Sequence, residues 1–152
     1  YILYVRRHFI YTRFLTLPEI ITYLLNLALA NHINIEATRA LSSETPSLVI
    51  ADQHKIIINL NWHNQKELPF QIAHEISHLL NHDDGVLYYT AFSFKSKIEA
   101  AANSTAIELL AEYYCDNFIV NDINPVEFME VFGIPQNLEH QVTNKLAIIF
   151  SE

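Results

Sequence analysis

Residues 69–81 read Pro-Phe-Gln-Ile-Ala-His-Glu-Ile-Ser-His-Leu-Leu-Asn and contain the pattern His-Glu-x-x-His at positions 74–78. Apolar residues recur here at helical spacing, which predicts an amphipathic helix. His74 and His78 are one turn apart on such a helix and point the same way, so their imidazoles can bind one zinc ion. Glu75 lies about 100° around the helix, where it can reach a water at the metal without being a ligand.

A catalytic zinc site has three protein ligands, so a third is needed beyond the two histidines. Glu99 lies 21 residues after His78 on the next predicted helix. Asn103, one turn further, faces the same way and can hydrogen-bond a liganding group. Asp84, six residues after His78, is the alternative third ligand. Proteases with that arrangement need a glycine three residues after the second histidine, where this chain has Asn81. The residues favour Glu99 and leave Asp84 open.

The elements expected on either side of this segment define an α+β fold. A small three-stranded sheet should lie beside a helical half in one domain that covers residues 1–152. The pattern predicts a helix at about 18–30, strands within 33–60 (33–37 and a hairpin of 47–51 and 55–60), metal-site helices at about 69–81 and 97–120, and C-terminal helices within 125–149.

Acidic residues are concentrated in the second part of the chain. Residues 1–67 carry six basic and five acidic groups, whereas residues 68–152 carry three and twelve, within a formal net charge of -8. Such a surface repels phosphates, which argues against direct nucleic-acid binding. Only two glycines occur, so glycine-rich phosphate loops are absent as well.

The apolar stretches do not have the pattern of a membrane protein. Residues 20–35 carry no formal charge, but they are too few and too polar for a membrane span, and no signal-peptide pattern is present. Cys115 is the only cysteine, which excludes an intrachain disulfide and a cysteine metal cluster. We expect a cytoplasmic protein with a buried Cys115 thiol.

Two further segments carry a family resemblance when they are taken together with this helix. Residues 71–82 read Gln-Ile-Ala-His-Glu-Ile-Ser-His-Leu-Leu-Asn-His, and residues 98–110 read Ile-Glu-Ala-Ala-Ala-Asn-Ser-Thr-Ala-Ile-Glu-Leu-Leu. With Val-Phe-Gly-Ile-Pro at 131–135, they resemble the ImmA/IrrE metallopeptidases, the DUF955 group, whose pattern is His-Glu-x-x-His followed by Glu-x-x-Ala-Asn-x-Phe-Ala-x-x-Leu-Leu. Thr105 stands where that pattern has Phe.

The resemblance implies a zincin-like fold and a gluzincin-like minimal zinc protease. Carried over by position, the ligands of one zinc per chain fall on His74, His78 and Glu99, and the general base falls on Glu75. Members of the family often occur in phages and mobile elements and cleave a helix-turn-helix repressor at a single site. The resemblance therefore implies a protein substrate, such as a basic DNA-binding repressor.

Residues and resemblance together favour a zinc-dependent endopeptidase. The alternatives are a non-catalytic regulatory or interaction module on a zincin scaffold and a component of a toxin–antitoxin pair. Glu75 argues against the first, because a structural metal site needs no base. We expect an extended substrate to pair with an exposed sheet edge at Lys55–Leu60, and Trp62 to be a core anchor. Candidates for stabilising the oxyanion are Tyr88, Tyr89, Tyr113, Tyr114 and His140.

Overall fold

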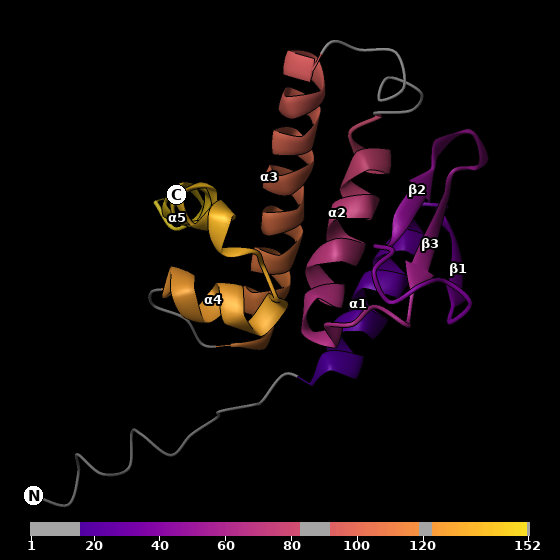
Figure 1. Ribbon diagram of the computed structural model, residues 1–152. Helices are drawn as coiled ribbons and strands as arrows, with labels where there is room; N and C mark the ends of the chain where they lie inside the picture. The colour runs from indigo at the N-terminus through magenta and orange to yellow at the C-terminus, as the bar shows by residue number, and fades with distance from the viewer. Residues whose placement is uncertain (1–15, 83–91, 119–122, 152) are drawn as a thin grey trace, which may run out of the picture.

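The computed structural model describes residues 16–82, 92–118 and 123–151, and it is an α+β structure with a small mixed sheet and several helices (Figure 1). The order of elements is α1 (Leu17–Ala30), β1 (Asn34–Thr38), β2 (Leu48–Ile50), η1 (Ala51–Gln53), β3 (Lys55–Asn59), η2 (Gln65–Glu67), α2 (Leu68–Leu80), α3 (Phe92–Asn117), α4 (Pro125–Phe132), η4 (Gln136–Leu138) and α5 (Glu139–Ile149). Among these residues, no helix is both long enough and apolar enough to span a membrane.

The three strands pair in the order β1-β3-β2. β1 runs parallel to β3 from Asn34 opposite Lys55 to Thr38 opposite Asn59, whereas β2 is antiparallel to β3. The hairpin expected from the sequence is therefore present, but its second strand is the central one. The expectation that Lys55–Leu60 offers a free sheet edge is wrong, because β3 is paired on both sides, and β1 and β2 are the outer strands among the described residues.

α2 lies between the sheet and α3, with α1 behind it (Figure 1). Ile72 and Ile76 of α2 are fully buried and belong to the same core as Ile56 and Ile58 of β3. On the other side, α2 packs along α3, where small residues such as Ala106 are fully buried. The helix that carries both histidines is thus held by core packing on two sides, which fixes the direction of its polar stripe.

The C-terminal elements pack on α3. The first of them, α4, has a residue at each end that favours the end of a helix. Asn124 caps α4 by accepting hydrogen bonds from the backbone N–H groups of Val126 and Glu127. Gly133 ends α4 in the left-handed conformation at φ 65°. η4 and α5 then return the chain to α3, where the Gln141 side chain donates a 2.7 Å hydrogen bond to the carbonyl of Ala100.

Two details differ from the expectations. α3 begins at Phe92, before the expected residue 97. Cys115 is exposed rather than buried, because its helix turns Tyr113 and Tyr114 into the core and leaves residues 115 and 116 on the outer face. Trp62 packs against the core only in part, and its indole Nε1–H donates to the Glu67 carboxylate at 2.8 Å, just before α2.

Candidate metal centre

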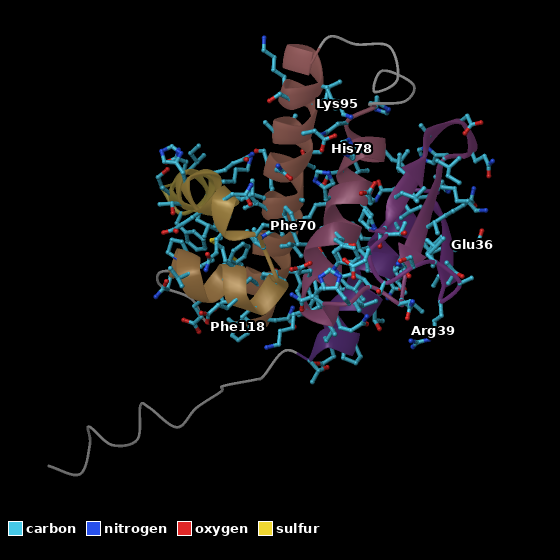
Figure 2. The ribbon with its side chains drawn as sticks, in the orientation of Figure 1. Glu36, Arg39, Phe70, His78, Lys95 and Phe118 are labelled. Atoms are coloured by element: carbon cyan, nitrogen blue, oxygen red, sulfur yellow. The ribbon has the colours of Figure 1, made fainter. Side chains whose placement is uncertain are left out.

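The structure brings His74, His78 and Glu99 together between α2 and α3. The two histidine Nε2 atoms are 3.0 Å apart, and Oε2 of Glu99 lies 3.2 Å from His74 Nε2 and 3.7 Å from His78 Nε2. Phe70 and His78, from the two ends of α2, both lie on its α3 side (Figure 2). Within the described residues, no other group of three histidine, cysteine or acidic side chains is placed to share one metal ion.

These three separations fit the coordination shell of zinc. Two ligand atoms of a tetrahedral zinc site with ordinary bond lengths of 2.0–2.2 Å are about 3.4 Å apart. The observed 3.0, 3.2 and 3.7 Å scatter around that value. Two imidazoles and one carboxylate also form a typical catalytic donor set, which leaves a fourth position for water or substrate.

The ionisation of His74 suits a metal ligand. Burial lowers the pKa of His74, and the neighbouring His78 lowers it further, while Glu99 and Asn103 act in the opposite direction. A lowered pKa favours the neutral imidazole, which is the form that binds a metal. The buried Nδ1 atom of His74 has no hydrogen-bond partner within the described residues. Asn103, which the sequence placed one turn beyond Glu99, is the neighbouring side chain able to support this ring.

Glu75 lies beside the three donors and faces the sheet. Burial raises the pKa of its carboxyl to about 8, and the negative charge of Glu99 adds to the rise, while a hydrogen bond from the backbone of Val49 opposes it. A carboxyl whose pKa is near neutral is suited to general acid–base chemistry, because it can both accept and return a proton at working pH.

Two contacts join α2 to β2 and to the residue just before it. The backbone N–H of Ser47 donates a 3.2 Å hydrogen bond to Oε1 of Gln71, and Val49 contacts Glu75 through its backbone. Gln71 and Glu75 are one helical turn apart, which matches the spacing of alternate residues along a strand. The edge of the sheet therefore runs beside the polar stripe of α2, and it orients the Glu75 carboxylate.

Gln71, His74 and Glu75 of α2 line a cleft of about 370 Å³. Its floor comes from α2, and one wall comes from Pro46 and Ser47 at the start of β2. The opposite wall comes from the chain between α4 and α5. The lining is completed by the following residues: Glu67, Phe70, Gln71, His74, Glu75, Asn103, Gly133, Pro135, Asn137 and Leu138.

Three of the remaining candidates, Tyr113, Tyr114 and His140, do not line this cleft. Tyr113 stacks on Tyr23, and Tyr114 packs on Phe118 and on the aromatic rings of α4, so both belong to the core. His140 is exposed at the start of α5, where its Nδ1 lies 3.2 Å from Asn144 Nδ2. The other three candidates, Asp84, Tyr88 and Tyr89, lie outside the described residues.

The sequence analysis did not identify Gln71 as part of the site, nor residues 133–138 as one wall of its cleft. Gln71 stands one turn before Glu75, on the same polar stripe as both histidines, which was a readable signal for a polar contact at the site. Gly133 and Pro135 are residue types that commonly end a helix, but nothing in the local pattern indicates which part of the molecule a turn will pack against.

Comparison with known proteins agrees with this geometry. The family model of peptidase M78, described as the IrrE N-terminal-like domain, matches residues 30–114, which is more than half of the chain. The matched range contains β1 to β3, α2 and most of α3, and thus His74, Glu75, His78 and Glu99. No curated protein and no solved structure shows significant similarity to the chain.

Proposed function

The chain belongs to the IrrE N-terminal-like family of M78 peptidases, and from that premise we propose that it is a zinc-dependent endopeptidase. One observation carries the proposal: Nε2 of His74, Nε2 of His78 and Oε2 of Glu99 lie 3.0–3.7 Å apart, with Glu75 beside them at the mouth of a cleft. This is the arrangement that zinc-assisted hydrolysis needs, with three ligands and a nearby base.

In this proposal His74, His78 and Glu99 hold the metal. Zinc, when bound, supplies a Lewis acid that polarises the peptide carbonyl and acidifies a water molecule. The Glu75 carboxylate takes a proton from the attacking water and returns it to the leaving amine nitrogen. The backbone of Val49 keeps that carboxylate at the sheet side of the cleft. A base at this position distinguishes a catalytic centre from a purely structural metal site, which has no use for one.

An extended substrate segment would lie along β2 rather than β3. β2 is an outer strand of the sheet within the described residues, and Pro46 and Ser47, just before it, line the cleft beside Glu75. Strand addition supplies main-chain hydrogen bonds that do not depend on substrate sequence, so selectivity must come from side-chain contacts in the cleft.

The proposed substrate is a basic DNA-binding repressor of a phage or mobile element. The net charge of −9 in residues 68–152 supports this choice, because an acidic surface attracts a basic protein and accelerates its association. Such attraction weakens as salt is added, since the Debye length falls to about 8 Å at physiological ionic strength.

The proposal is tested by measuring the zinc content of the protein and the cleavage of a repressor. The purified wild-type chain should bind about one zinc per chain, and His74→Ala or His78→Ala should lose it. A repressor encoded near this chain is then co-expressed with wild type or with Glu75→Gln. We expect fragments only with wild type, whereas Glu75→Gln should keep zinc and lose at least about a hundredfold in activity. Equal fragmentation with both proteins, or no zinc above background, would refute the proposal.

A further inference from the structure

The cleft beside Glu75 is completed by residues beyond the family-matched range 30–114. Gly133, Pro135, Asn137 and Leu138 come from the chain between α4 and α5, and they face His74 and Glu75 across the cleft. The ligands and the base therefore lie within the matched domain, while one wall of the cavity that a substrate side chain would enter lies outside it.

This wall is fixed at both ends. At its start, Gly133 packs so closely on the backbone of Lys66, just before α2, that an added Cβ would overlap the Lys66 carbonyl oxygen. The backbone N–H of Ile134 also donates to the carbonyl of Met129, at 2.9 Å. Past its end, Gln141 donates to the carbonyl of Ala100, the residue after Glu99. Residues 135–138 are thus held against both metal-site helices.

The surfaces that face each other across the cavity are largely apolar. Phe70 is 7% exposed on α2, Pro46 lies on the sheet side, and Leu138 packs partly against the core. Among the described residues that line the cavity there is no lysine or arginine to pair with an acidic side chain. Each Glu67 carboxylate oxygen already accepts one hydrogen bond from a neutral donor, Trp62 or Asn64, and the aminobutyl compound below tests whether this carboxylate also attracts a basic side chain.

We propose that the 133–138 segment is the specificity wall of this peptidase, and that Leu138 selects an apolar substrate side chain next to the bond that is cleaved. The inference rests on the proposed function and names the chemistry of its substrate at that position. A branched aliphatic side chain would be removed from water between Phe70 and Leu138, whereas a carboxylate there would meet Glu75 and Glu67.

The experiment measures equilibrium binding rather than turnover. Four hydroxamates with the same short backbone are titrated into the zinc-loaded full-length chain, and calorimetry gives their dissociation constants. The parent compound has no side chain, and the other three carry an isobutyl, a carboxymethyl or an aminobutyl side chain. We expect the isobutyl compound to bind at least about tenfold more tightly than the other three. Leu138→Trp should weaken isobutyl binding about tenfold and leave the parent within about twofold, while Leu138→Ala should improve binding of a larger benzyl compound.

The matched controls are Leu29→Trp and Leu29→Ala, on an α1 residue that is 62% exposed and does not line the cavity; they should change nothing. Equal binding of parent and isobutyl compounds to wild type would overturn this inference and leave the zinc site intact. An equal effect of Leu138→Trp on every compound would overturn it too. Failure of even the parent to bind would refute the zinc centre itself, and the inference with it.

Discussion

The side-chain oxygen of Gln71 accepts a hydrogen bond from the backbone N–H of Ser47 over 3.2 Å, and this contact joins the residue just before β2 to the helix that carries Glu75. Ser47 is only 3% exposed, so its N–H has little access to water if Gln71 is lost. Its hydroxyl is also engaged, because it accepts a hydrogen bond from the backbone N–H of Asn59. One side chain thus satisfies a buried donor and sets the distance between β2 and α2.

Replacing Gln71 should therefore destabilise the protein. Gln71→Met keeps the length of the side chain and removes the acceptor, which leaves a buried N–H unpaired at a cost of about 1–3 kcal/mol. Gln136→Met makes the same chemical change at an exposed position and serves as the control. Urea unfolding of both variants and wild type measures the effect. A free energy of unfolding that is the same for Gln71→Met and wild type would show that the Ser47 contact contributes nothing.

The choice of third ligand can be tested directly. Glu99→Ala should weaken zinc binding by at least about tenfold, because it removes the only carboxylate among the three donors described here. Asp84→Ala should leave zinc affinity unchanged. Competition with a chromophoric chelator gives both dissociation constants under one set of conditions. If only Asp84→Ala loses the metal, the ligand set His74, His78 and Glu99 is wrong.

The metal-free protein should lose stability as the pH rises through neutrality. The pKa of Glu75 is raised to about 8 in the fold from an ordinary value of 4.5, mainly by burial and then by Glu99. Between these two values the native state binds more protons than the unfolded state, so the free energy of unfolding falls with pH. One such group gives a slope of at most about 1.4 kcal/mol per pH unit.

Glu75→Gln should remove most of that slope between pH 5 and pH 8, because the amide does not titrate. Thermal unfolding of both proteins in the presence of a chelator gives the comparison. The variant should be the more stable of the two at pH 8 and differ little at pH 5. His74, whose pKa is lowered in the fold, contributes the opposite slope below its ordinary value of 6.5, so the comparison between the two proteins is the decisive measurement. A stability difference between Glu75→Gln and wild type that does not grow from pH 5 to pH 8 would contradict the inferred environment of Glu75.

The sequence was sufficient for the parts of the structure that depend on local pattern. Helical periodicity, Pro69 and the His-Glu-x-x-His spacing predicted α2 and the direction of its histidines. The position of Glu99 on the next helix and the family resemblance both favoured it as the third ligand, and it lies beside the two histidines. Pairing of strands depends on contacts between distant residues, which is why β3 was taken as an edge although β1 and β2 flank it. Cys115 was misplaced for a related reason: the exposed face of α3 is decided by which neighbours cover the helix.

Gly133 provides a test of the wall opposite the metal centre. Its φ of 65° is a conformation that an L-residue adopts at a cost of about 1–2 kcal/mol, and a Cβ there would also overlap the backbone of Lys66. Gly133→Ala should thus lower the free energy of unfolding by about 2 kcal/mol or more. The nearby exposed Gln136→Ala should stay within about 0.5 kcal/mol of wild type.

The same substitution should also act on the cleft, because relieving the overlap moves residues 133–138 away from Lys66 and the start of α2. Zinc affinity should not change, since none of the three donors lies on this segment. Binding of the isobutyl hydroxamate should weaken by about tenfold at a temperature where the variant is fully folded. Unfolding in urea, zinc titration and hydroxamate calorimetry on one preparation separate the three effects. Loss of zinc together with the apolar ligand would show that the turn supports α2 itself and has no separate role in shaping the cavity.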